Sequence, residues 1–156
     1  MIELKVLMVC LGNICRSPLA EGIFSEKAKQ SSIQFHVDSA GTGNWHSGES
    51  PDPRSIAVAK KHGIDISHQR ARQIKPNDFS TFDFIFTMDQ SVHNDVVRLM
   101  GDKKEKDKVF LLLTYAGLSP SIEVADPYWG GEPEFESTYQ LLNTACEAVV
   151  ARFSKT

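Results

Sequence analysis

The chain has 156 residues, of which 41% are hydrophobic; this length suits one domain with a proper core, so we expect residues 1–156 to form a single domain. Its formal net charge is −3 with scattered Lys and Arg, and its apolar runs are short, which argues against a nucleic-acid partner and against a membrane protein. Three cysteines, an odd number, and a start without a signal-peptide pattern favour the reducing cytoplasm.

The first half of the chain alternates strand patterns with helix patterns. Residues 6–9 and 35–39 form apolar runs typical of strands, whereas residues 17–30 and 53–62 have helical periodicity. The second helix follows Asp52-Pro53, which resembles a cap and a first-turn proline. The predicted order of elements is therefore β-α-β-α.

The second half continues this alternation after a polar stretch at residues 65–81. The predicted elements are strands at 84–86 and 109–113, helices at 90–100 and 134–153, and a mostly loop segment at 114–131. Cys146 lies on the apolar stripe of the last helix and is predicted to be a core residue. Strands that alternate with helices predict an α/β fold with a four-stranded parallel sheet and helices on both faces.

The loop after the first strand carries the most informative motif. Five residues separate Cys10 from Arg16, so the thiol and the guanidinium lie at the two ends of one short loop. A loop of this length can curl around a tetrahedral anion, with the sulfur directed at phosphorus and the guanidinium bound to two oxygens. Gly12 lets the backbone approach the anion, which would lie at the N-terminus of the helix that Pro18 begins. The predicted phosphate-binding residues are Leu11, Gly12, Asn13, Ile14, Cys15, Arg16 and Ser17.

The same position favours the thiolate form of Cys10, since helix N-termini and neighbouring cations stabilise thiolates. A thiolate that attacks phosphorus also needs an acid for the departing oxygen. Asp126 is the best candidate, because it lies in a loop where Pro127 restricts the backbone and two glycines permit sharp turns. Asp-Pro is by itself an ordinary turn signal, but the Cys10 motif makes a general acid the preferred interpretation.

These motifs resemble those of the low-molecular-weight protein tyrosine phosphatases almost end to end. The matching segments are Val9 to Pro18, Asp38-Ser39-Ala40-Gly41-Thr42, Pro51-Asp52-Pro53-Arg54, Gly63-Ile64-Asp65, His68-Gln69-Arg70-Ala71-Arg72-Gln73 and Asp126-Pro127. The resemblance implies a flavodoxin-like fold of the phosphotyrosine phosphatase I type. It also implies that Cys10 is the nucleophile, Arg16 the phosphate clamp, and Asp126 the acid of the first step and the base of the second.

Further roles follow from the same resemblance. Ser17 would stabilise the Cys10 sulfur as a leaving group, and Asn13, Ser39 and His68 would form a network that holds the loop in shape. The reaction would be ping-pong through a cysteinyl-phosphate, with no metal and no cofactor. Substrates would be tyrosine-phosphorylated proteins and small aryl phosphates, and the protein would be a monomer or a weak homodimer.

Aromatic residues are predicted to form the walls of the pocket. Trp45 matches a position that flanks the pocket mouth in the resembling family, and Tyr128 with Trp129 would form the facing wall. Such a slot suits a flat aryl group. Cys15 is either a small apolar residue that packs the loop or, as the family resemblance supports, the partner of a reversible disulfide with oxidised Cys10.

Four other functions are weighed against this one. A thioredoxin-coupled arsenate reductase would need further cysteines, and none lies between Cys15 and Cys146. A protein arginine phosphatase usually has threonine where this loop has Ile14. A non-catalytic phosphopeptide-binding module would be expected to have lost Cys10 or Asp126, and both are present. A structural zinc site would need paired ligands at other spacings.

Overall fold

The protein is built on a four-stranded parallel sheet. The computed structural model describes residues 3–101, 104–118 and 123–154, and its strands are β1 (Glu3–Cys10), β2 (Gln34–Gly41), β3 (Phe84–Thr87) and β4 (Val109–Leu111). They lie in the order β2-β1-β3-β4, and every pairing is parallel. The predicted α/β fold with four parallel strands is confirmed.

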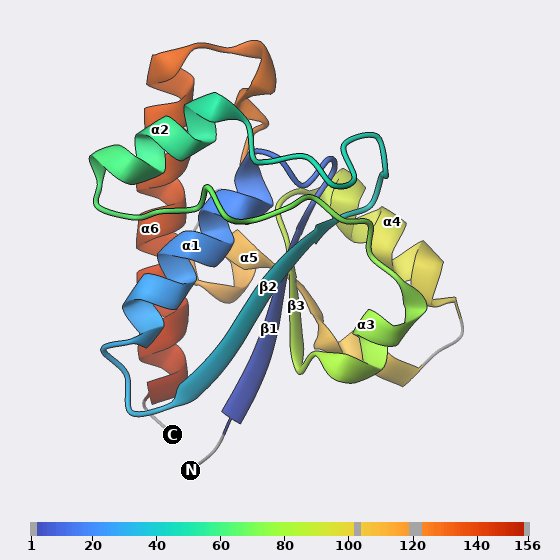
Figure 1. Ribbon diagram of the computed structural model, residues 1–156. Coiled ribbons are helices and arrows are strands. Elements are labelled where there is room, and N and C mark those ends of the chain that lie inside the picture. The colour runs from blue at the N-terminus through green and yellow to red at the C-terminus, as the bar shows by residue number, and fades with distance from the viewer. Residues whose placement is uncertain (1–2, 102–103, 119–122, 155–156) are drawn as a thin grey trace.

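Helices cover both faces of the sheet (Figure 1). On one face lie α1 (Arg16–Ala28), α2 (Pro53–Lys61), the short α5 (Leu112–Tyr115) and α6 (Glu132–Ser154). On the other lie α3 (Pro76–Thr81) and α4 (Gln90–Met100). Two 3₁₀ turns, η1 (Lys104–Lys108) and η2 (Pro127–Trp129), complete the described elements. Within these elements no helix is long and apolar enough to span a bilayer.

The central strand β1 shows why the sheet is covered on both sides. Val6 and Met8 belong to the core cluster beneath α1 and α6, whereas Leu7 and Val9 belong to the cluster beneath α3 and α4. All four side chains have no exposed surface. Because successive strand residues point to opposite faces, a continuous apolar run is what a strand buried on both faces requires.

Two elements differ from the sequence predictions. Helix α3 lies inside the stretch identified only as polar; Pro76 occupies its first turn, and the Asp78 carboxylate accepts a hydrogen bond from the Lys75 backbone N–H at 2.8 Å. Strand β4 ends at Leu111 rather than Leu113, because Leu112 and Leu113 both pack into the same core cluster. Consecutive strand residues cannot do this, but a helical turn can. Residues 119–122 of the predicted loop lie outside the described residues.

The order of the strands indicates where on the sheet a ligand would bind. The carboxyl ends of the strands point toward the end of the molecule opposite the chain termini (Figure 1). From β1 the chain passes to β2 on one side, and β3 and β4 then lie on the other side. In open α/β sheets, ligands bind at this kind of switch point. Cys10 is the last residue of β1, and Asp89 follows the end of β3.

Candidate active site

The loop formed by residues 10–16, called the Cys10 loop below, connects β1 to α1 and turns its carbonyl oxygens outward. The carbonyls of Cys10 and Leu11 accept hydrogen bonds from the backbone N–H groups of Thr42 and Gly43, at 3.0 and 2.9 Å. A Cβ atom at Gly41 would lie 2.8 Å from the Leu11 oxygen, so only glycine lets β2 approach this closely. Outward carbonyls leave the N–H groups facing the interior of the loop, as anion binding requires.

Asn13 fixes the shape of the loop. Its φ of 58° makes it the one non-glycine residue with positive φ in the described part of the chain, and Asn tolerates this conformation better than most residues. Its Nδ2 donates to the hydroxyls of Ser17 at 2.7 Å and Ser39 at 3.0 Å, and its Oδ1 accepts from the Arg72 backbone N–H at 3.0 Å. The turned backbone directs the Asn13 N–H at the Cys10 sulfur, 3.3 Å away.

The sulfur of Cys10 has a hydroxyl beside it. Ser17 Oγ lies 3.0 Å from Cys10 Sγ and 3.5 Å from the carbonyl oxygen of Ala40. Because Asn13 already donates to Ser17 Oγ, the hydroxyl hydrogen is free for one of these two acceptors. The sulfur is the nearer one. The Ser17 hydroxyl and the Asn13 N–H together therefore stabilise negative charge on the sulfur.

The network continues from Ser39 to Glu21, a residue that the sequence analysis did not single out. The Glu21 side chain lies on α1 and interacts electrostatically with Ser39. Burial raises the pKa of Glu21 from 4.5 to about 7, and nearby Asp38 raises it further, whereas the Ser39 hydroxyl and Arg72 act in the opposite direction. A titratable carboxyl therefore lies at the far end of the network that begins at the Cys10 sulfur.

The structure does not bring His68 into this network. In the segment 66–71 the side chains of Ile66, Gln69 and Ala71 are buried, whereas His68 is exposed. Gln69 points inward instead, and its Nε2 donates to the Pro18 carbonyl at 3.0 Å. In place of a histidine side chain, the segment contributes the backbone N–H of Arg72, which donates to Asn13.

Two hydrogen bonds orient the Arg16 guanidinium in the pocket. Its Nη1 donates to Asp89 Oδ2 at 2.6 Å and to the Val124 carbonyl at 3.0 Å. The side chain is only 3% exposed. Burial opposes its charge, but Cys10 and Asp89 raise the pKa of Arg16 above its usual value. Because both bonds use Nη1, the opposite edge of the guanidinium remains directed toward the pocket.

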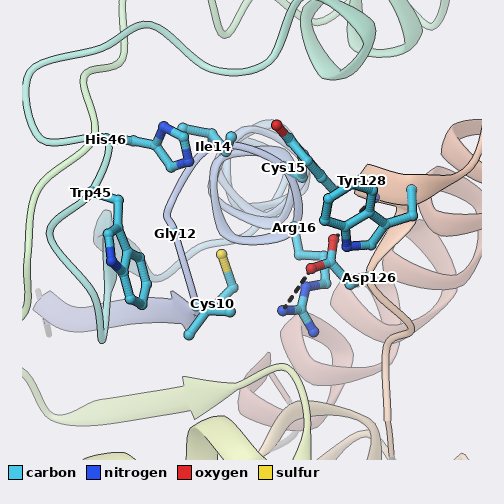
Figure 2. A pocket seen from close by; sticks show the side chains of 11 residues that line it. Cys10, Gly12, Ile14, Cys15, Arg16, Trp45, His46, Asp126 and Tyr128 are labelled. Atoms are coloured by element: carbon cyan, nitrogen blue, oxygen red, sulfur yellow. Dashed lines mark hydrogen bonds and ion pairs between the residues drawn. The ribbon is translucent and has the colours of Figure 1, made fainter.

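Asp126 lies beside Arg16 in the pocket (Figure 2). Its Oδ2 lies 3.8 Å from Arg16 Nη2, and its Oδ1 accepts a hydrogen bond from the Tyr128 N–H at 3.0 Å at the start of η2. The side chain is 38% exposed. The carboxyl predicted to be the acid thus opens to the same space as the thiol and the guanidinium.

These groups share one cavity of about 280 Å³. Aromatic side chains form its rim: Trp45 is 67% exposed, Tyr128 37% and Trp129 89%. The Trp45 ring packs on Gly43, where any side chain would overlap it. Figure 2 shows Trp45 and His46 on one side of Cys10, with Asp126 and Tyr128 on the other. The lining residues are Cys10, Leu11, Gly12, Ile14, Cys15, Arg16, Trp45, His46, Asp126, Tyr128 and Trp129.

His46 and Asp89 are further site residues that the sequence analysis missed. His46 lines the cavity, and its Nδ1 lies 3.2 Å from Glu49 Oε2. It follows directly on the predicted Trp45, which is the one sequence signal that could have found it. Asp89 precedes a helix and looks like an ordinary cap; only its position after β3, at the carboxyl edge of the sheet, could have suggested more.

Cys15 lines the same cavity as Cys10. Burial, reinforced by the charges of Asp52 and Cys10, raises the pKa of its thiol to about 12. Cys15 therefore remains a neutral thiol at neutral pH. The predicted core residue Cys146 is fully buried on α6. The described residues contain no cluster of three or more His, Cys, Asp or Glu side chains that could hold a metal ion.

Comparisons with known proteins identify the family of the chain. A family model described as low molecular weight phosphotyrosine protein phosphatase matches residues 5–156. The enzyme of that name from Homo sapiens is 42% identical over 151 residues, or 95% of this chain and 94% of the human protein. The one from Schizosaccharomyces pombe is 42% identical over 140 residues, or 88% of each chain. A crystal structure of a protein tyrosine phosphatase from Entamoeba histolytica, with Hepes in the active site, has a TM-score of 0.91 at 33% identity and 97% coverage of both chains. The chain therefore belongs to the low molecular weight phosphotyrosine protein phosphatases, the family that its motifs predicted.

Proposed function

We propose that this protein hydrolyses phosphotyrosine in proteins through a cysteinyl-phosphate intermediate. The observation that carries the proposal is that Cys10, Arg16 and Asp126 all line one cavity. In the first step the Cys10 thiolate forms a bond to phosphorus, and the bond from phosphorus to the phenolic oxygen breaks. The Asp126 carboxyl gives its proton to that oxygen, so that neutral tyrosine leaves.

The second step releases phosphate. The Asp126 carboxylate removes a proton from water, the water oxygen bonds to phosphorus, and the bond from sulfur to phosphorus breaks. The departing thiolate is stabilised by the hydroxyl of Ser17, 3.0 Å from the sulfur. Throughout both steps, Arg16 and the inward N–H groups of the Cys10 loop stabilise the negative equatorial oxygens. This charge stabilisation is the main catalytic task in phosphoryl transfer.

The rim supports the choice of phosphotyrosine. A tyrosyl ring that reaches the Cys10 loop would pass between Trp45 and Tyr128, which line the cavity, and Trp129 would extend the wall. A phosphoserine is too short to bring its phosphate to the floor of such a slot. In the Entamoeba histolytica relative, Hepes lies in the active site. Hepes carries a tetrahedral sulfonate, and the Cys10 loop of the present protein is suited to an anion of that shape.

Cys10→Ser tests the covalent route. The variant should lose turnover while vanadate, a phosphate mimic, still protects it from thermal unfolding. Measurable turnover by the variant contradicts a cysteinyl-phosphate.

The assays need a reductant, because Cys10, Cys15 and Cys146 are all free thiols and an oxidised nucleophile is inactive. For the same reason we place the activity in a reducing compartment, the cytoplasm.

Matched phosphotyrosine, phosphoserine and phosphoarginine peptides test the substrate. Phosphate release confined to phosphotyrosine is the expected result. Preference for phosphoarginine would instead identify a protein arginine phosphatase and mean that Ile14, which lines the cavity, does not exclude that substrate. Binding of the peptides without any turnover would identify a phosphopeptide-binding module.

A further inference from the structure

The N-terminus of α2 lies between the two loops that carry the reacting groups. Asp52 caps this helix: its Oδ1 accepts from the Arg54 backbone N–H at 2.8 Å. The same carboxylate binds the Arg54 guanidinium through Nε at 3.0 Å and Nη2 at 2.9 Å. Asp52 is 8% exposed and the Arg54 side chain 39% exposed. The two-pronged pairing fixes the plane of the guanidinium.

Toward the Cys10 loop, this helix end binds two outward carbonyls. The Asp52 backbone N–H donates to the Ile14 oxygen at 2.8 Å, and the Ser55 hydroxyl donates to the Cys15 oxygen at 3.3 Å. Both acceptors immediately precede Arg16, the phosphate clamp. Residues 52–55 are therefore attached directly to the loop that would hold the phosphoryl group.

Toward Asp126, Arg54 binds the backbone of residues 126–131, called the acid loop below. Its Nη2 donates to the Tyr128 carbonyl at 3.1 Å and its Nη1 to the Gly130 carbonyl at 2.9 Å. The guanidinium also lies 4.5 Å from the centre of the Phe135 ring on α6. The first carbonyl belongs to η2 and the second to the residue that follows it, and the Tyr128 N–H of the same turn donates to the Asp126 carboxyl.

We propose that Arg54 is a positioning residue that holds the acid loop over the Cys10 loop, so that Asp126 reaches the leaving oxygen, and that Asp52 holds Arg54. This inference rests on the proposed function, because it assigns Arg54 to the step in which Asp126 gives up its proton. A lysine cannot replace Arg54, since a single ammonium cannot bind a carboxylate with two donors and reach two carbonyls in one plane.

The inference predicts a loss that depends on the leaving group. Phenolate is strongly basic and needs the proton from Asp126 in order to leave, whereas p-nitrophenolate leaves without protonation. A displaced acid loop should therefore slow the hydrolysis of phenyl phosphate far more than that of p-nitrophenyl phosphate. For Arg54→Lys and Arg54→Gln we expect kcat/KM for phenyl phosphate to fall at least tenfold and kcat/KM for p-nitrophenyl phosphate to fall less than threefold. Asp52→Asn, which keeps the helix cap, should show a weaker form of the same pattern.

Arg152→Gln is the matched control. Arg152 also donates to a backbone carbonyl, that of Tyr115 at 2.9 Å, and lies 4.1 Å over an aromatic ring, but it does so near the end of α6 and away from the cavity. It should leave both rates unchanged. Circular dichroism and thermal unfolding of every variant establish that the fold is intact, and Arg54→Lys serves if Arg54→Gln does not fold.

A double variant separates this inference from the proposed function. Once Asp126→Ala has removed the acid, Arg54→Gln should cause no further loss on phenyl phosphate. Equal losses on both esters, or the same loss with and without Asp126, overturn the role of Arg54 and leave the acid role of Asp126 standing. If Asp126→Ala itself slows both esters equally, the acid assignment fails, and the inference fails with it.

Discussion

Asp89 and Arg16 lie 73 positions apart in the sequence and 2.6 Å apart in the structure. The Asp89 carboxylate accepts two hydrogen bonds. Its Oδ2 accepts from Arg16 Nη1, and its Oδ1 accepts from the Val92 N–H at 2.8 Å and so caps α4. Because the cap fixes Asp89 to a helix, the guanidinium is oriented before any phosphate enters. In the phosphate-binding role proposed for Arg16, the binding energy of the substrate would therefore not be needed to order the guanidinium.

Replacing Asp89 by Asn tests this orientation. The Asn oxygen keeps the helix cap, but the amide nitrogen then faces Arg16 and cannot accept its hydrogen. Losing a hydrogen bond between charged groups costs about 1.5–3 kcal/mol, so we expect kcat/KM to fall about 10- to 100-fold. Asp95→Asn, which breaks an exposed pair with Arg98 on the same helix, is the control and should have little effect. Equal behaviour of the two variants would contradict the positioning role of Asp89.

The sequence predicted the architecture because most elements carry strong local signals. Val6 to Val9 are apolar without interruption and are buried on both faces, and α2 begins at a capped proline. Helix α3 was missed since its six residues include one large apolar side chain, Phe79, among polar ones. Its start depends on Asp78 binding the Lys75 N–H, and such short caps are easily taken for turns.

Some residues of the candidate site could be predicted from the sequence, and others could not. Cys10 and Arg16 lie on one loop, so their proximity could be predicted locally, and Asp126, which was proposed as the acid, lines the same cavity. Asp89 could not be found, because its partner is distant in sequence and it looks like any helix cap. Glu21 resembles an ordinary helix-surface acid; only the fold brings it to Ser39.

Two substitutions of Asn13 separate its backbone role from its side-chain role. Asn13→Ala and Asn13→Gly both remove the hydrogen bonds to Ser17, Ser39 and Arg72, and both should lower kcat/KM. Glycine adopts positive φ freely, so Asn13→Gly should be more stable than Asn13→Ala by about 1 kcal/mol. Urea unfolding and steady-state kinetics measure the two effects. Full activity in the glycine variant would mean that the side-chain network is dispensable.

Cys15→Ser tests the proposed protection of the nucleophile. Peroxide converts Cys10 to a sulfenic acid, which Cys15 would trap as a disulfide with loss of water, leaving a form that thiols can reduce. In Cys15→Ser the untrapped sulfenic acid reacts with a second equivalent of peroxide and becomes a sulfinic acid, which thiols cannot reduce. After excess peroxide, dithiothreitol should therefore restore wild-type activity but not that of Cys15→Ser. Since the pKa of Cys15 is raised to about 12, disulfide formation should accelerate as the pH rises from 6 to 8. The control is Cys146→Ala, which removes the other buried thiol; equal recovery in wild type and Cys15→Ser would mean that Cys15 only packs the loop.

Glu21→Gln should change how the free energy of unfolding varies with pH, compared with the wild type. Because burial raises the pKa of Glu21 from 4.5 to about 7, the folded state keeps a proton that the unfolded chain releases between these values. The wild type is therefore destabilised as the pH rises through this window, by up to roughly 3 kcal/mol once the pH exceeds the folded-state pKa.

Glutamine has the same shape and never ionises, so the variant escapes this penalty. We expect the two proteins to have nearly equal free energies of unfolding in urea at pH 4.5, and the Gln variant to be the more stable one at pH 8. The difference between the two proteins is the relevant quantity, because every other titrating group contributes equally to both. A difference that stays constant from pH 4.5 to 8 would show that Glu21 ionises in the folded protein as it does in the unfolded chain, and the network behind Ser39 would then end in a permanently charged carboxylate.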